Sequence, residues 1–227
     1  MIQNKEILRS NLDQVLWNLE EARLKVSDHH IVKLVVVGKY TEIENIATLY
    51  ELGQRAFGEN QVQQLKERMG LLENLPLEWH MIGNLQKNKI NNLIDLSPSL
   101  MHSLDSLSLA EELNKKLIAK DTTMSCLLQI NAAAEESKSG FSPEEAYDRY
   151  KQIIESYPAI KLKGVMTIGA HTTDTKLIQE SFETTYTLYE KLQKDGATIC
   201  SMGMSGDYEL AIECGSNLIR VGSAIFK

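Results

Sequence analysis

Eight short apolar segments alternate along this chain with stretches of helical periodicity, and this alternation restricts the possible folds more than any other feature. The first segment, residues 31–38, reads IVKLVVVG, and so many β-branched residues together are typical of a strand buried on both faces. The strand candidates begin near Ile31, Arg55, Leu77, Leu100, Cys126, Leu162, Ile199 and Asn217. Their spacing leaves room for a helical crossover between parallel strands each time.

The helical stretches lie between these segments, and one more precedes them. Residues 2–29 carry apolar side chains at spacings of three and four, which predicts an amphipathic helix before the first strand. The other predicted helices cover residues 42–52, 61–72, 85–93, 106–119, 143–157, 176–194 and 208–214. Eight such units predict a compact (β/α)8 TIM barrel with an extra N-terminal helix. An open doubly wound sheet is the alternative, although no Gly-x-Gly-x-x-Gly motif follows the first strand.

Length and composition predict a single domain that spans residues 1–227. The chain is 43% hydrophobic, which is enough for one buried core, and no linker rich in proline, glycine or serine divides it. The net charge of −7 argues against a nucleic-acid or anionic-membrane partner, since both need clustered positive charge. No apolar run is long enough to cross a membrane, and the polar amino terminus is unlike a secretory signal.

The cysteines and histidines predict no metal site. Cys126, Cys200 and Cys214 lie in or beside apolar segments without metal-type spacing, which indicates buried, reduced thiols in a cytoplasmic protein. The five histidines have no metal-type spacing among themselves either.

Lys39 directly follows the first predicted strand. In a barrel of this kind, functional residues gather at the carboxyl ends of the strands. An amine that loses part of its hydration there is more readily neutral, and a neutral amine can attack an aldehyde. By itself, Lys39 is better explained as simply the first exposed residue after a strand, and the phosphate-binding pattern near the end of the sequence favours the functional interpretation.

Two glycine- and serine-containing turns follow the last two predicted strands. Residues 201–207 read SMGMSGD, where the backbone around Ser205 and Gly206 can approach a ligand closely and present N–H groups. Gly222 and Ser223 offer further donors after the final strand. Most such turns only reverse the chain, but barrels often bind phosphate after strands seven and eight, so this pair predicts a phosphate site.

Two further residues allow both a structural and a functional reading. Arg220 lies inside an apolar run, where a charge is costly unless it is paired, so a buried salt bridge is one explanation. The other is that its guanidinium donates to a ligand acceptor such as a ring nitrogen. His80 follows a tryptophan on a strand, and such a histidine is more often a hydrogen-bonded core residue than a catalyst.

Taken together, several blocks of sequence resemble the pyridoxal phosphate homeostasis protein family, also called the proline synthetase co-transcribed protein family. The resemblance covers nearly the whole chain. The blocks are FGEN (57–60), WHMIGNLQKNK (79–89), ESKSGF (136–141), GVMTI (164–168), SMGMSGD (201–207) and IRVGSAIF (219–226). Their number and order make the match far more specific than any one block.

The resemblance implies a barrel similar to the cofactor domain of alanine racemase, with pyridoxal 5′-phosphate (PLP) bound covalently as a Schiff base, an aldimine, at Lys39. It implies that Asn60 and His80 lie near the cofactor and that Arg220 faces the pyridine nitrogen. The residues implied to hold the phosphate are Ser205, Gly206, Gly222 and Ser223.

The chain departs from the family pattern at two places. The family usually has a serine before its lysine and a Lys-x-Lys-Pro-like stretch there, whereas this chain has Gly38 and the sequence YTE at residues 40–42. The lysine is kept, so the covalent link is expected to survive. The sequence also stops at Lys227, where relatives often continue with a glycine and a short tail.

Three functions fit these residues. The first is a cytoplasmic vitamin B6 homeostasis protein, expected to be a monomer, that holds PLP exchangeably and passes it to apo-enzymes that use PLP. The second is a small amino-acid racemase, which needs an acid–base group on each face of the cofactor.

The racemase is the less favoured of these two. In the alanine racemase pattern the opposing tyrosine comes from a C-terminal domain for which this sequence leaves no room, and Tyr40 is the one tyrosine here that could replace it. An arginine at the ring nitrogen also weakens carbanion stabilisation, so a carrier is favoured over a catalyst. The third is a barrel that binds another phosphate ester, with Lys39 as an ion-pair donor.

Overall fold

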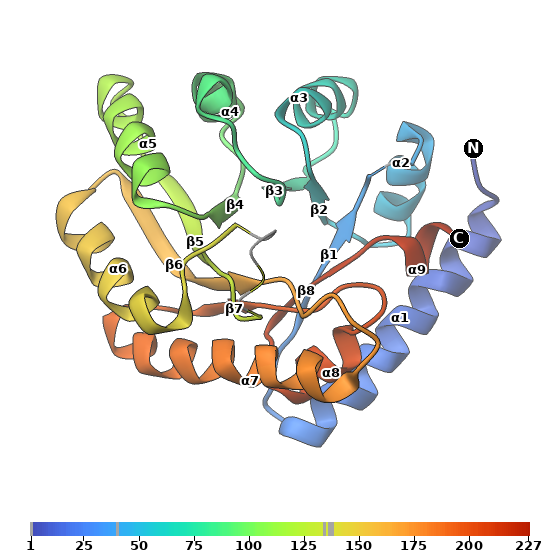
Figure 1. Ribbon diagram of the computed structural model, residues 1–227. Coiled ribbons are helices and arrows are strands. Elements are labelled where there is room, and N and C mark those ends of the chain that lie inside the picture. The colour runs from blue at the N-terminus through green and yellow to red at the C-terminus, as the bar shows by residue number, and fades with distance from the viewer. Residues whose placement is uncertain (1, 40, 134, 136–138) are drawn as a thin grey trace.

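The fold is an eight-stranded parallel barrel. A computed structural model describes residues 2–39, 41–133, 135 and 139–227. The strands follow chain order around the barrel, and β1 pairs with β8 to close it (Figure 1). They are β1 (Lys33–Val37), β2 (Ala56–Glu59), β3 (Glu78–Met81), β4 (Leu100–Leu104), β5 (Met124–Ile130), β6 (Ile160–Thr167), β7 (Ile199–Ser201) and β8 (Leu218–Val221). The predicted TIM barrel is confirmed, and closure excludes the open doubly wound sheet.

The helices follow the predicted alternation with small differences. They are α1 (Lys5–Val26), α2 (Ile43–Glu51), α3 (Val62–Leu71), α4 (Ile90–Leu96), α5 (Leu107–Ala119), α6 (Pro143–Ser156), α7 (Thr175–Leu192), α8 (Tyr208–Glu213) and α9 (Ser223–Phe226), with 3-10 turns η1 (Lys87–Lys89) and η2 (Gln193–Asp195). The helix expected at residues 85–93 begins only at Ile90, because η1 occupies its start. The short α9 was not predicted, since four residues are too few to show a helical period.

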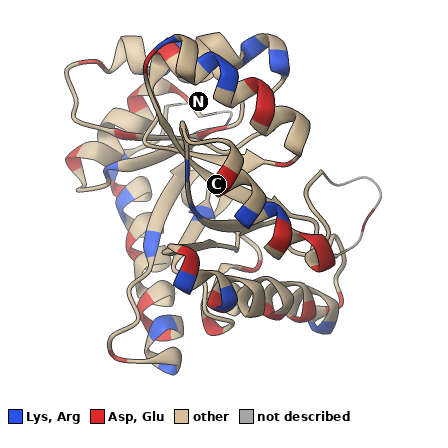
Figure 2. Ribbon diagram, turned by 90° about the vertical axis from the view of Figure 1, so that its left-hand side faces the viewer, with Lys and Arg blue, Asp and Glu red and all other residues tan. Residues whose placement is uncertain are grey.

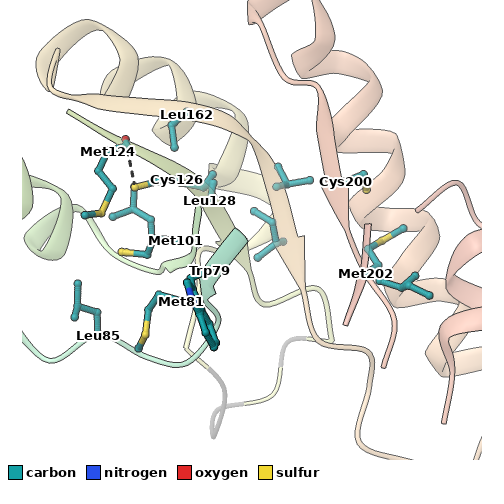
Figure 3. Close-up of a cluster of buried hydrophobic side chains, with 14 of the residues drawn as sticks. Trp79, Met81, Leu85, Met101, Met124, Cys126, Leu128, Leu162, Cys200 and Met202 are labelled. Atoms are coloured by element: carbon teal, nitrogen blue, oxygen red, sulfur yellow. Dashed lines mark hydrogen bonds between the residues drawn. The ribbon is translucent and has the colours of Figure 1, made fainter. Parts of the chain in front are cut away.

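Successive side chains on each strand alternate between the barrel interior and the layer beneath the helices. Trp79, Met81 and Met101 belong to the outer layer, where they pack with apolar residues of the surrounding elements (Figure 3). A smaller apolar cluster lies in the interior and consists of Val35, Ala56, Leu100, Leu127, Met166 and Leu218. Both faces of each strand are therefore buried, which is the physical reason that the strands read as continuous apolar runs.

The extra N-terminal helix α1 packs beside α8 and α9 (Figure 1). It begins after Asn4, whose side chain accepts a hydrogen bond from the Glu6 N–H at 2.9 Å. The apolar face of α1 is buried in the outer core. Because α8 contains only 6 residues and α1 contains 22, the long helix covers barrel surface that α8 leaves open.

Positively and negatively charged residues are interspersed along the outer helices (Figure 2). In the described part of the chain, no helix is both long and apolar enough to span a bilayer.

Candidate functional site

A cleft of about 810 Å³ opens at the carboxyl end of the barrel. It is bounded by the loops after β1, β2, β3, β6, β7 and β8, which are adjacent in space because the strands are parallel. Most of the residues predicted to hold a ligand line this one cleft, namely Lys39, Asn60, Ser205, Gly206, Arg220, Gly222 and Ser223. Segments as far apart in sequence as β1 and β8 therefore contribute to the same space.

The backbone around Lys39 is held by a buried ion pair. Arg68 on α3 pairs with Glu59 at the end of β2, and both side chains are almost completely buried. The Arg68 guanidinium also donates to the Gly38 carbonyl at 2.5 Å and to the Thr41 carbonyl at 2.6 Å. One side chain therefore bonds to the chain on both sides of Lys39.

The same ion pair explains why glycine stands before the lysine. A Cβ atom on Gly38 would lie 2.4 Å from Glu59 Oε1 and 2.5 Å from Arg68 Nη1, closer than real Cβ atoms approach other groups. The departure from the family's serine at this position is thus matched by a carboxylate and a guanidinium that fill the space. Tyr40, the other residue of interest in this loop, lies outside the described residues.

The turn after β7 is shaped by Gly203. Its φ of +93° is in the left-handed region, and a Cβ there would lie 2.7 Å from the Ala211 Cβ. Asp207 holds the other end of the turn, since its carboxylate accepts the Met204 N–H at 2.6 Å. The turn brings Ser205 and Gly206 to the cleft.

Backbone donors after β8 converge on one oxygen atom. The N–H groups of Gly222 and Ala224 donate to the Ser205 Oγ at 3.1 Å and 3.3 Å. Two N–H groups that share one acceptor suit an oxygen with several lone pairs, such as an oxygen of a phosphate. The two turns that the sequence predicted as donors are thus in direct contact.

Arg220 enters the cleft from the barrel interior. Its side chain is buried and donates to the Ser201 hydroxyl at 2.5 Å and to the Thr167 carbonyl at 2.9 Å. Burial lowers the pKa of the Arg220 guanidinium to about 10, so the group stays protonated at neutral pH. Among the described residues Arg220 forms no ion pair, so the salt bridge considered from the sequence is not found.

His80 is the one predicted residue that does not line the cleft. It is 1% exposed, and its ring nitrogens contact Glu78 and His102 in the barrel interior. It shares the barrel with the other residues but lies beneath the cleft surface. Among the described residues, no group of three or more possible metal ligands is found.

The cleft has apolar and close-packed parts that sequence reasoning missed. Ile82, Met166, Ile168 and Met204 line its wall. The signal that could have identified them is their position at strand ends beside polar residues. Gly83 also lines the cleft, and a Cβ on it would lie 2.1 Å from the Asn60 carbonyl oxygen, so the loops after β2 and β3 require glycine at their contact. Of the ESKSGF block, residues 136–138 lie outside the described residues.

The arrangement combines the amines of Lys39 and Lys227 with a buried guanidinium and a set of N–H and hydroxyl donors around a partly apolar space. It suits an anionic, planar ligand of moderate size. Among the described residues that line the cleft, none is a tyrosine, histidine, cysteine or carboxylic acid.

Comparisons with known proteins identify the fold and the family. Residues 10–227 match the family described as alanine racemase, N-terminal domain. A protein from Helicobacter pylori strain J99, named pyridoxal phosphate homeostasis protein, is 52% identical over 96% of this chain and 98% of its own length. PipY from Synechococcus elongatus PCC7942, solved with PLP bound, has a TM-score of 0.82 at 28% identity and covers 97% of this chain and 100% of its own. An alanine racemase from Clostridium difficile 630 shares the fold, with a TM-score of 0.76 at 16% identity, and this chain covers 59% of it.

Proposed function

Because this chain belongs to the pyridoxal phosphate homeostasis protein family, we propose that it binds PLP in the cleft and takes part in vitamin B6 homeostasis. The observation that carries the proposal is the meeting of Lys39, Arg220 and the Ser205–Gly222 turns in one cleft. These groups match the three parts of PLP, which are an aldehyde, a pyridine nitrogen and a phosphate. The volume of about 810 Å³ is within the range of small-molecule sites.

Each group has a distinct part in the proposed site. Lys39 provides the amine for a Schiff base with the aldehyde, and Arg220 donates to the ring nitrogen. The donors for the phosphate are Ser205, Gly206, Gly222 and Ser223. Asn60 lies against the cofactor, and His80 acts from beneath the cleft. When bound, PLP supplies an electrophilic carbon and an electron-withdrawing ring.

A carrier is favoured over a racemase by the residues of the cleft. Racemisation needs a second acid–base group opposite the lysine. Among the described lining residues, Asn60 and Asn84 cannot transfer a proton at neutral pH, and no tyrosine, histidine, cysteine or side-chain carboxylate is present. Lys227 is the one other amine among them. A protonated Arg220 at the ring nitrogen leaves the ring neutral, which weakens its ability to stabilise a carbanion.

The carrier and the racemase differ in α-proton exchange. The PLP-loaded protein is incubated with L-alanine and other amino acids in deuterated water, and the α-proton signal is followed by NMR. We expect no exchange at the turnover typical of enzymes, roughly 1 per second or faster. Exchange at that rate, absent from a Lys39→Ala control, favours the racemase.

Replacing Arg220 tests its placement at the ring nitrogen. Arg220→Gln keeps a donor but removes the charge, and we expect the Kd for PLP to rise on the order of tenfold or more, because a charge-assisted hydrogen bond is lost. Absorbance titration with PLP measures the change. The exposed Arg55 provides the control, since Arg55→Gln is expected to leave the Kd unchanged. Equal affinity in wild type and Arg220→Gln contradicts the placement.

The remaining parts of the proposal are the partners and the setting. We propose that the single barrel domain, residues 1–227, works as a monomer and delivers PLP to apo-enzymes. The free thiols of the buried Cys126 and Cys200 are compatible with a reducing compartment, so the cytoplasm is the proposed location.

The alternative is a site for another phosphate ester, with Lys39 only as an ion-pair donor. Such an ester would then bind as well as PLP. Competition of inorganic phosphate and pyridoxine phosphate with PLP distinguishes a PLP site from a general phosphate-ester site.

A further inference from the structure

We infer that Glu78, His80 and His102 are positioning residues that orient Arg220 through a hydrogen-bonded chain across the barrel interior. The inference rests on the proposed function in one respect, since it assumes that Arg220 faces the cofactor. The hydrogen-bonded chain itself is present in the protein without any ligand.

The chain runs between the two ends of the barrel. At the amino end, the ammonium of Lys33 on β1 contacts the Glu78 carboxylate on β3 at 2.5 Å. Glu78 Oε1 lies 2.9 Å from His80 Nε2, and His80 Nδ1 lies 2.9 Å from His102 Nε2 on β4.

From His102 the contacts continue to the cleft. His102 Nδ1 lies 3.2 Å from the Ser201 Oγ on β7, and that oxygen accepts from Arg220 Nη1 at 2.5 Å. His80, His102, Ser201 and Arg220 are all almost completely buried. Five strands (β1, β3, β4, β7 and β8) thus contribute to one polar path that ends at a residue of the cleft.

The ionised carboxylate at one end and neutral histidine rings together set the direction of every hydrogen bond. Glu78 can only accept, so His80 donates to it from Nε2 and accepts at Nδ1 from His102 Nε2. His102 Nδ1 then accepts the hydrogen of the Ser201 hydroxyl, whose oxygen accepts from the Arg220 guanidinium. With both rings neutral and protonated on Nε2, each donor in the chain meets an acceptor.

The electrostatic setting agrees with a neutral His102 and an ionised Glu78. Burial, together with nearby positive charges that include those of Arg220 and Lys33, lowers the pKa of His102 well below its ordinary value, so this ring is neutral. The hydrogen bond from His80, with the nearby Lys33, lowers the pKa of Glu78 to about 2, so the carboxylate is ionised. A cation at one end and an anion at the other polarise the neutral groups between them in one direction.

A purely structural role does not account for this hydrogen-bonded chain of polar residues. An apolar cluster that includes Val35, Leu127 and Met166 lies beside this path in the barrel interior. Burying four polar groups there costs desolvation that an apolar filling avoids. What the polar path adds is a defined orientation for the Arg220 guanidinium, which points at the cleft.

The histidine tautomers test the chain without any cofactor. The apo-protein is labelled with 15N-histidine, and long-range 1H–15N NMR spectra identify the protonated nitrogen of each ring. We expect His80 and His102 to be protonated on Nε2 alone at pH 7.5. A doubly protonated His80 at this pH, or a His102 protonated on Nδ1, overturns the inference, because the chain then has the opposite direction.

Two substitutions of the remote carboxylate test transmission to Arg220. In Glu78→Leu the acceptor for His80 is gone, so we expect the His102 tautomer to change. We also expect the Kd for PLP to rise roughly 2- to 12-fold, the change that one net hydrogen bond corresponds to. Glu78→Gln keeps an acceptor oxygen and is expected to restore the wild-type tautomers and most of the affinity. Glu51→Leu, which removes an exposed carboxylate paired with Lys5, is the matched control.

These readouts separate the inference from the proposed function. If the wild-type protein does not bind PLP, the proposed function fails, but the histidine tautomers still show whether the hydrogen-bonded chain exists. If the protein binds PLP and Glu78→Leu changes neither the His102 tautomer nor the Kd, the positioning role is wrong and the proposed function stands.

Discussion

A Lys39→Ala variant is expected to lose the covalent attachment of PLP completely. Only an amine can form the Schiff base. Lys39 and Lys227 both line the cleft, and we propose that Lys39, which directly follows β1, forms it. Protein incubated with PLP is reduced with borohydride, and peptide mapping locates the trapped pyridoxyl group. We expect wild type to carry it on Lys39 and to show an absorbance band in the visible or near-ultraviolet that the variant lacks.

The control for this experiment is Lys115→Ala, which removes an exposed lysine on α5. It is expected to be labelled like wild type. A Lys39→Ala protein that binds PLP with the same absorbance band and the same trapped group shows that another lysine forms the link. Residual PLP binding without trapping is expected, because the phosphate donors and Arg220 are unchanged, but it will be weaker.

The second large effect is expected from the buried ion pair next to Lys39. In Glu59→Leu the Arg68 guanidinium stays buried without its carboxylate, and we expect the free energy of unfolding to fall by about 3–5 kcal/mol. Chemical denaturation measures this change. Hydrogen exchange is expected to be faster at the Gly38 and Thr41 amides, because Arg68 bonds to the carbonyls of the same two residues.

A double variant separates the loss of a pair from the loss of a charge. Glu59→Leu with Arg68→Met removes both charges together, so it is expected to be more stable than either single variant. The exposed pair of Lys25 and Glu213 is the comparison, where Glu213→Leu is expected to change stability by less than about 1 kcal/mol. Additive losses in the double variant would falsify the view that the two buried groups compensate each other.

The barrel could be predicted from the sequence because its signals are local. Each strand begins within two residues of the expected position, since a buried strand needs a short β-branched run and the following helix needs a period near 3.6. The predicted cluster of Lys39, Ser205, Gly206, Gly222 and Ser223 needed only one further rule. Parallel strands place all their carboxyl ends on one side, so residues that follow strands gather there.

The errors came from elements without a local signal. The helix expected at residues 85–93 begins only at Ile90, because the 3-10 turn η1 occupies Lys87–Lys89 after a loop whose residues 82–84 line the cleft. Arg220 could be paired or ligand-facing on sequence grounds alone. Its neutral partners, Ser201 and Thr167, belong to other strands and became known only from the folded barrel.

The amino-acid sequence by itself determined the barrel, the family and the residues at the strand ends, because periodicity, turn chemistry and motif order are written along the chain. The tertiary structure alone decided which inward-facing side chains touch. Contact between His80 and His102, or between Glu59, Arg68 and the backbone at Gly38, depends on the register and closure of the sheet, which bring residues from separate strands and helices within bonding distance. The physical reason is that a hydrogen bond needs atoms within about 3 Å, and no pattern along the sequence specifies that distance.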